Sequence, residues 1–426
     1  MIRPSQLYQR VVSFPLFQNL SWMVVSEGMA RASRLVTLFV LANQFSNRDY
    51  GLAMLALLIH ELFRVFTRLG TGARIIQCDN SVLLSTLGNA ATLQWCVTLL
   101  ISALQILLAE LIANYYDYPE LATLLKWMAI AHLCYPLVSV RIFESQRQNK
   151  LRYFGIASGI CVSFENLCVA LLATTGFGIY AIVYAKIAAA IAWVGLFWRL
   201  PSLCSRCIFE AKSMRSLLAF SSQTLSSELT RTLRFQADSL IAARLLTPDM
   251  FGLYTFAKSA GLGIAQSFTM AYQVALYPYL CKQNRAGNGG IAFRKTWYVT
   301  LGICTLFAAQ ALLAPVYIEL LFGQRWENAE FVSTLLCVIA IPTLIMDHAG
   351  LTLRANNQPA RELLLIALCT TSLFVTLAIA LPNSPQQMAT YFLVSSITWL
   401  TLLWFPVFGQ RSVVTPNNKL ARIAAH

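Results

Sequence analysis

Charged side chains recur at helical spacing inside segments of the chain that are otherwise apolar. Arg31 and Arg34 follow Glu27 by four and seven residues, which places all three on one face of a helix. Charged residues are costly inside a membrane, so they normally face a water-filled cavity or a partner helix. The segment therefore predicts that a charged group is handled inside the protein.

Other segments repeat this pattern, with charged side chains gathered within about 100 or 120 degrees of the helix circumference. They are, in chain order, His60, Glu61, Arg64 and Arg68 and then Glu228, Arg231, Arg234 and Asp238. Lys258 follows, with the polar residues Gln266, Thr269 and Gln273 on nearly the same side.

This set of residues suits an anion that carries a sugar. Guanidinium groups hold phosphate oxygens through paired, charge-assisted hydrogen bonds, and amides and hydroxyls suit sugar hydroxyls. We therefore expect a substrate cavity lined by Arg31, Arg34, Arg64, Arg68, Arg231, Arg234 and Lys258. The acidic residues expected to tune its charge are Glu27, Glu61, Glu228 and Asp238. Protonation of Glu27 or Glu228 is a candidate for coupling release to a proton gradient.

The alternative interpretation is structural. Glu27 and Arg31 would then form an ion pair that joins two helices, and Glu228 and Asp238 would neutralise the two arginines between them. Three arginines in the first half exceed what its acidic neighbours neutralise, which favours the cavity there.

Five other polar residues in apolar segments have simpler expectations. Glu165 and Lys186 are predicted to form one ion pair, and His132 to be a hydrogen-bonded core residue. Asp347 and His348 are expected at a solvated helix end, with a proton relay as the alternative.

The elements that position these residues must be membrane helices. Of the 426 residues, 57% are hydrophobic and 12% charged, whereas ordinary globular chains have about 25% charged residues. The fold class is therefore an all-α polytopic membrane protein. Apolar runs of about 20 residues predict twelve transmembrane helices, near 20–43, 51–73, 85–110, 121–142, 153–175, 178–199, 215–243, 250–278, 294–318, 328–350, 361–381 and 386–408.

The distribution of basic residues predicts the orientation. Most of the 32 Lys and Arg residues fall on the side of the N-terminus, and Arg48, Arg244 and Arg325 lie in loops on the other side. Both termini are therefore expected in the cytoplasm. The net charge of +14 then reflects topology and contact with anionic lipid, and nucleic acid is not expected as a partner.

An internal repeat predicts two halves. Residues 42–52 (ANQFSNRDYGL) align with residues 243–253 (ARLLTPDMFGL) at an offset of 201, which also places Glu27 on Glu228. We expect a six-helix lobe over 1–200, a cytoplasmic loop over 201–214, and a second six-helix lobe with a tail over 215–426. The two pseudo-symmetric lobes would surround a central cavity and rock about it to give alternating access.

Motifs of enzymes are missing from the sequence. It has no Gly-rich phosphate loop with Lys, no zinc spacing such as H-E-x-x-H and no nucleophile elbow, and the lone C-x-x-C at Cys204 and Cys207 has no second pair. We expect neither enzyme activity nor a cofactor or metal. A membrane polysaccharide polymerase is the enzyme alternative, but the predicted outside loops are too short for its catalytic groups.

Several short blocks resemble one family of transporters. They are residues 41–52, 68–77 (RLGTGARIIQ), 114–121 (NYYDYPEL), 217–221, 238–242, 251–258 and 321–329 (LFGQRWENA). These blocks are similar to those of bacterial polysaccharide transporters, the Wzx-type flippases, in the exporter superfamily that also contains multidrug antiporters.

The resemblance implies a flippase in the bacterial inner membrane. Its substrate would be an undecaprenyl-diphosphate-linked oligosaccharide, the repeat unit of O-antigen or another surface polysaccharide, moved from the cytoplasmic to the periplasmic leaflet. Expected partners are this substrate, membrane lipids and, as further candidates, a polysaccharide polymerase and a chain-length regulator. The alternative within the superfamily is an ion-coupled multidrug antiporter, but cationic drugs favour an acid-rich cavity, whereas Arg predominates in the first half.

Overall fold

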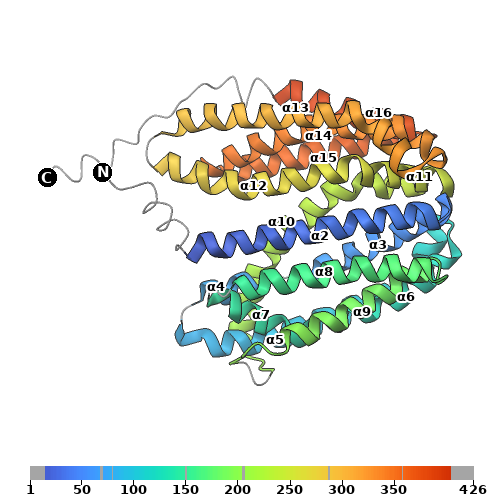
Figure 1. Cartoon of the computed structure of the whole chain (residues 1–426). Helices are drawn as coiled ribbons and strands as arrows, with labels where there is room; N and C mark the ends of the chain where they lie inside the picture. Colours follow the sequence, from blue (N-terminus) through green and yellow to red (C-terminus); the bar gives the residue numbers. More distant parts are fainter. Residues whose placement is uncertain are drawn as a thin grey trace. The chain divides into compact units, whose positions relative to one another are not determined.

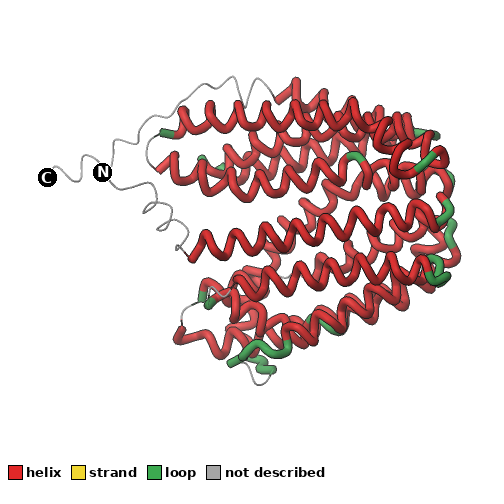
Figure 2. The backbone as a smooth tube through the Cα atoms, in the orientation of Figure 1, coloured by secondary structure: helices red, strands yellow, loops and turns green. Residues whose placement is uncertain are grey.

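The computed structural model describes residues 15–67, 71–78, 80–148, 151–203, 207–285, 288–356 and 358–403. Figure 2 shows that these residues form helices joined by loops and turns, with no strand among them. By internal packing the chain divides into two compact units, Met1–Leu233 and Arg234–His426, called here the N-terminal and the C-terminal unit.

The helices follow the predicted apolar segments (Figure 1). From the N-terminus to the end of the linking helix they are α2 (Pro15–Gln44), α3 (Asn47–Thr67), α4 (Thr71–Gln77), η1 (Asn80–Val82), α5 (Leu83–Tyr116), α6 (Pro119–His132), α7 (Pro136–Arg147), α8 (Leu151–Thr174), α9 (Tyr180–Phe197) and α10 (Ala211–Leu245). They continue as α11 (Pro248–Ala260), α12 (Leu262–Arg285), α13 (Gly289–Phe322), η2 (Gln324–Trp326), α14 (Glu327–Ala355), α15 (Pro359–Ala380) and α16 (Pro385–Leu403). Each of the twelve predicted segments overlaps one of these helices or a consecutive pair, and residues 68–70 and 404–408 of two segments lie outside the described residues.

Seven of the described helices are long and apolar enough to cross a membrane, and an eighth crossing results if α6 and α7, bent by 50°, are one span. Large apolar side chains such as Leu107, Leu312 and Leu320 are more than 70% exposed, as expected of side chains that face lipid. The chain is therefore a multi-pass, all-helical membrane protein, while twelve crossings remain a prediction.

Proline and residues with positive φ mark where helices begin and end. Pro119, Pro248 and Pro359 occupy the first turn of α6, α11 and α15, where the missing N–H of proline has no helical partner to lose. The helix α5 ends at Asp117 with φ 59°, and α13 ends at Gly323 with φ 78°. A residue with positive φ stops a helix there because it turns the chain away from the helical path.

Close packing within the N-terminal unit brings α2 against α8, and α8 against α9 (Figure 1). The Asn166 side-chain amide donates to Ser33 Oγ at 2.9 Å, and Thr37 Oγ1 donates to the Asn166 carbonyl at 2.7 Å. Such hydrogen bonds between helices are typical of membrane bundles. They fix the rotation of α2, the helix that carries Arg31 and Arg34.

The C-terminal unit has its core around α14, which packs against α11, α12, α13 and α16. At one end, the rings of Phe256 and Trp326 stack at 3.8 Å between centroids, and Phe322 meets Phe256 edge-on at 5.0 Å. These three residues come from two of the blocks that carry the family resemblance. The aromatic residues of blocks 251–258 and 321–329 therefore serve packing within this unit.

Candidate functional site

Four charged side chains meet inside the N-terminal unit, and we call them the charge cluster: Glu61 and Arg64 on α3, Glu165 on α8 and Lys186 on α9. The Lys186 ammonium lies 2.5 Å from Glu165 Oε1 and 3.6 Å from Glu61 Oε1. The predicted ion pair between Glu165 and Lys186 is therefore confirmed. Lys186 also joins α3 to α8 and α9, because it lies between two carboxylates.

Glu61, one helical turn before Arg64, holds the Arg64 guanidinium within the charge cluster. Its Nε donates to Glu61 Oε2 at 2.8 Å, and its Nη2 lies 2.5 Å from the same oxygen. The Glu61 and Arg64 side chains are 30% and 28% exposed, whereas Lys186 is 8% exposed. Lys186 is thus the most buried member of the cluster, whereas the Arg64 and Glu61 side chains are partly exposed.

The other predicted site residues of the first half lie along α2. Arg31 is half-buried and Arg34 is exposed. Arg68 and the side chain of Glu27 lie outside the part of the chain that the structure describes. Four helices, α2, α3, α8 and α9, carry most of these charges. Their described side chains in predicted membrane segments include four cations, Arg31, Arg34, Arg64 and Lys186, and two carboxylates, Glu61 and Glu165.

In the C-terminal unit, Asp238 and Lys258 form a buried ion pair. The Lys258 ammonium donates to Asp238 Oδ1 at 2.7 Å, to Ser239 Oγ at 2.9 Å and to the Phe235 carbonyl at 3.0 Å. The second carboxylate oxygen of Asp238 accepts the Tyr254 hydroxyl at 2.8 Å. All three ammonium protons therefore have acceptors, and Asp238 is only 1% exposed.

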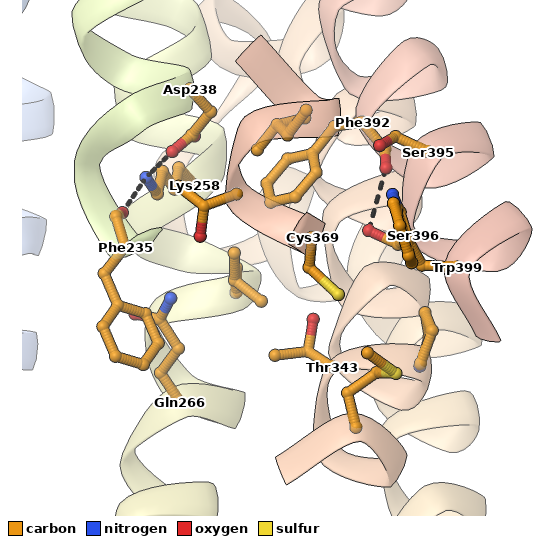
Figure 3. A pocket seen from close by; sticks show the side chains of 15 residues that line it. Phe235, Asp238, Lys258, Gln266, Thr343, Cys369, Phe392, Ser395, Ser396 and Trp399 are labelled. Carbon is orange, nitrogen blue, oxygen red and sulfur yellow. Dashed lines mark hydrogen bonds and ion pairs between the residues drawn. The ribbon is translucent and has the colours of Figure 1, made fainter. Parts of the chain in front are cut away.

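This ion pair lies at one wall of a pocket within the C-terminal unit. Figure 3 shows Lys258 and Asp238 on one side, with Cys369, Ser395 and Trp399 facing them across the pocket. The pocket measures about 70 Å³, which is well below the about 300–1,000 Å³ of typical ligand sites. This volume suits a few water molecules rather than an oligosaccharide.

The side chains of Glu228, Arg231 and Arg234 lie outside the described part of α10. Ser239 and Tyr254, which complete the surroundings of Asp238 and Lys258, were not among the predicted site residues. Tyr254 lies one helical turn before Lys258 and Ser239 directly follows Asp238, which was the available signal. A serine hydroxyl in a helix often bonds the backbone of its own helix, so Ser239 alone did not stand out.

Three further polar residues, Asp347, His348 and His132, are buried, which contradicts the prediction for the first two and confirms it for the third. Asp347 and His348 are 8% and 1% exposed, so the prediction of a solvated helix end is wrong. Both ring nitrogens of His348 meet threonine hydroxyls on α13, at 3.1 and 3.3 Å. His132 is a hydrogen-bonded core residue, as predicted, with its Nε2 2.9 Å from Gln105 Oε1.

Curated relatives share about a quarter of their aligned residues with this chain. The succinoglycan biosynthesis transport protein ExoT of Rhizobium meliloti is 24% identical over 73% of this chain and 63% of its own length. The lipopolysaccharide biosynthesis protein WzxC of Escherichia coli is 23% identical over 79% of this chain and 69% of its own. The match with ExoT thus spans less than two thirds of that relative.

Solved structures show the same fold. The lipid II flippase MurJ, in its inward closed conformation, superposes with a TM-score of 0.73 at 13% identity, over 90% of this chain and 87% of that one. The MATE transporter VcmN of Vibrio cholerae gives 0.63 at 14% identity, over 93% and 96%. A family model described as polysaccharide biosynthesis protein matches residues 40–330, more than half of the sequence, and the chain therefore belongs to this family.

Proposed function

We propose that the protein is a flippase that moves a lipid-linked oligosaccharide across the bacterial inner membrane, and not an enzyme. The substrate would be undecaprenyl-diphosphate-linked, and it would move from the cytoplasmic to the periplasmic leaflet by alternating access between two six-helix lobes. The charge cluster inside the N-terminal unit, in which Arg64 is one of the partly exposed members, carries this proposal. It is supported by relatives whose names place them in polysaccharide transport and biosynthesis.

In this proposal Arg31, Arg34 and Arg64 bind the diphosphate. Arg68, Arg231, Arg234 and Lys258 extend the basic lining, and Glu27, Glu61, Glu228 and Asp238 set how tightly it holds the anion. A polysaccharide polymerase and a chain-length regulator would act on the product after translocation.

The first test removes single charges. Arg64→Ala should abolish export of the surface polysaccharide while the protein remains inserted, because Arg64 supplies paired donors that alanine lacks. Surface polysaccharide is measured in a strain whose only copy of the gene carries the variant, with protein quantified in membrane fractions.

Arg48→Ala is the matched control. Arg48 also pairs with a glutamate, Glu120, at 2.8 Å, but it lies at the start of α3 rather than in the charge cluster. Its loss should leave export near the wild-type level. Normal export by Arg64→Ala at normal protein levels would refute the role assigned to Arg64.

A multidrug antiporter remains the competing proposal because VcmN, a MATE transporter, has the same fold. Extrusion of a cationic dye from cells, lost in Arg64→Ala without any change in polysaccharide, would support the antiporter instead.

A further inference from the structure

Two histidine rings stack at the interior of the N-terminal unit. The centroids of His60, on α3, and His132, on α6, are 4.3 Å apart with 14° between the ring planes. Both side chains are fully buried. Neither residue belongs to the charge cluster described above, although Glu61 follows His60 directly in sequence.

A glutamine on α5 fixes the protonation of both rings. Gln105 Nε2 donates to the Leu125 carbonyl at 2.7 Å, which identifies this atom as the amide nitrogen because a carbonyl only accepts. The same nitrogen contacts His60 Nδ1 at 3.3 Å, so Nδ1 accepts and the proton of His60 lies on Nε2. Gln105 Oε1 then accepts from Nε2 of His132 at 2.9 Å, which leaves Nδ1 of His132 unprotonated.

Each ring has one nitrogen left over. Nε2 of His60, a donor, and Nδ1 of His132, an acceptor, are buried and have no hydrogen-bond partner among the described residues. Buried polar atoms are nearly always bonded, so such a pair calls for an explanation. His348 has no such feature, since both of its nitrogens meet hydroxyls.

The charges around the stack are balanced. Glu61 and Arg64 face it from α3 and Lys186 from α9. Glu165 on α8 pairs with Lys186, and Tyr135, just before α7, faces Arg64. Two carboxylates and two cations sum to zero, so one added proton gives the whole group a net positive charge. A second proton, on a ring 4.3 Å away, is opposed by the first.

We propose that the stack of His60, Gln105 and His132 is a binding site for a single proton, and that its occupancy strengthens anion binding at Arg64. The proton comes from water or buffer and bonds to the lone pair on Nδ1 of His132, while Nε2 keeps its hydrogen bond to Gln105. The inference rests on the proposed function, because it takes Arg64 as a ligand of the diphosphate. Since linkage is reciprocal, anion binding at Arg64 also draws a proton onto the stack.

The test measures proton uptake on binding inorganic pyrophosphate. Purified full-length protein in lipid nanodiscs is titrated calorimetrically near neutral pH, in two buffers with different ionisation enthalpies. For each pyrophosphate bound, the wild type should take up more protons than His132→Gln does. The expected difference is a fraction of a proton that approaches one. The titration of pyrophosphate itself cancels in this difference.

His348→Gln is the matched control, because it removes an equally buried ring whose two nitrogens are already bonded. It should behave as the wild type. Equal proton uptake by the wild type and His132→Gln would overturn the linkage alone. Failure of the wild type to bind pyrophosphate would overturn the anion role of Arg64 in the proposed function, and the linkage with it.

A second measurement needs no change in the stack. The chain has 4 histidines, so nitrogen NMR of the wild type with isotopically labelled histidine resolves a small set of rings. On acidification one ring of the stack should gain a proton at Nδ1 while its neighbour stays neutral. Two rings that protonate together, or two that stay neutral until the protein unfolds, would contradict a single-proton site.

Discussion

The Lys258 ammonium shows how a charge is held inside a membrane protein. Its acceptors are a carboxylate, a hydroxyl and a backbone carbonyl, all within 3.0 Å. Removing one member of a buried ion pair leaves an uncompensated charge, whereas replacing both with neutral groups is often tolerated. The energetic role of the Asp238 and Lys258 pair is therefore open to a direct test.

Asp238→Asn alone should destabilise the C-terminal unit by roughly 3–5 kcal/mol, because Lys258 loses its counter-charge. The double variant Asp238→Asn with Lys258→Met should recover most of this loss, and the Tyr254 hydroxyl keeps an oxygen acceptor in asparagine. Thermal unfolding in detergent measures both. A double variant as unstable as the single one would show that the charge balance is not the source of the stability.

At the scale of elements, the packing of α2 on α8 depends on a glycine. A β-carbon added at Gly159 would lie 2.5 Å from Ser26 Oγ and 3.0 Å from Ser26 Cα. Small residues allow helix backbones to approach closely in membranes. Because α2 carries Arg31 and Arg34, this contact also sets where two of the proposed diphosphate ligands stand.

Gly159→Leu should push α2 away from α8 and destabilise the protein by about 1–3 kcal/mol through overpacking. Gly195→Leu is the control, since Gly195 also lies in a helix of the N-terminal unit and has nothing within 4 Å of an added β-carbon. Thermal unfolding compares the two, and export is measured alongside. Equal stability of both variants would show that α2 and α8 do not need the close approach.

At the scale of the whole molecule, the helix boundaries support the internal repeat. The helix α2 ends at Gln44 and α10 at Leu245, and the next helices begin at Asn47 and Pro248, all at the offset of 201 found in the sequence. The 34-residue helices α5 and α13 also correspond, and both end at a residue with positive φ. Long helices that correspond in this way, with turns at the same offset, are what a parallel repeat predicts.

Twelve crossings and cytoplasmic termini predict an alternating pattern of reporter activity. Alkaline phosphatase fused after Asp117, Gly176 or Thr247 should be active, because these loops are predicted in the periplasm. Fusions after Gln148, Ser202 or Asn288 should be inactive. Two consecutive fusions with the same activity would show that the helix between them does not cross the membrane. Such a result is expected if only the seven helices that are long and apolar enough cross it.

The sequence by itself determined the fold class and most of the helix positions, because burial in lipid imposes long apolar segments and local composition suffices to find them. It also determined the ion pair of Glu165 with Lys186, since two opposite charges in adjacent membrane helices have few other partners. The resemblance, too, was readable from the sequence, and the match to the family model confirmed it.

Only the tertiary structure decided which distant residues meet. The contact of Lys186 with Glu61 and the stack of His60 on His132 each join helices separated in the chain. The acceptors of Lys258 lie on the preceding helix, but which of its residues they are also depends on how the two helices pack. Helical periodicity gives the face of a residue but not the helix that the face meets, because that depends on packing among all the helices of the unit. Gln105, one polar side chain in a long apolar segment, therefore gave no sign in the sequence that it orders two histidines.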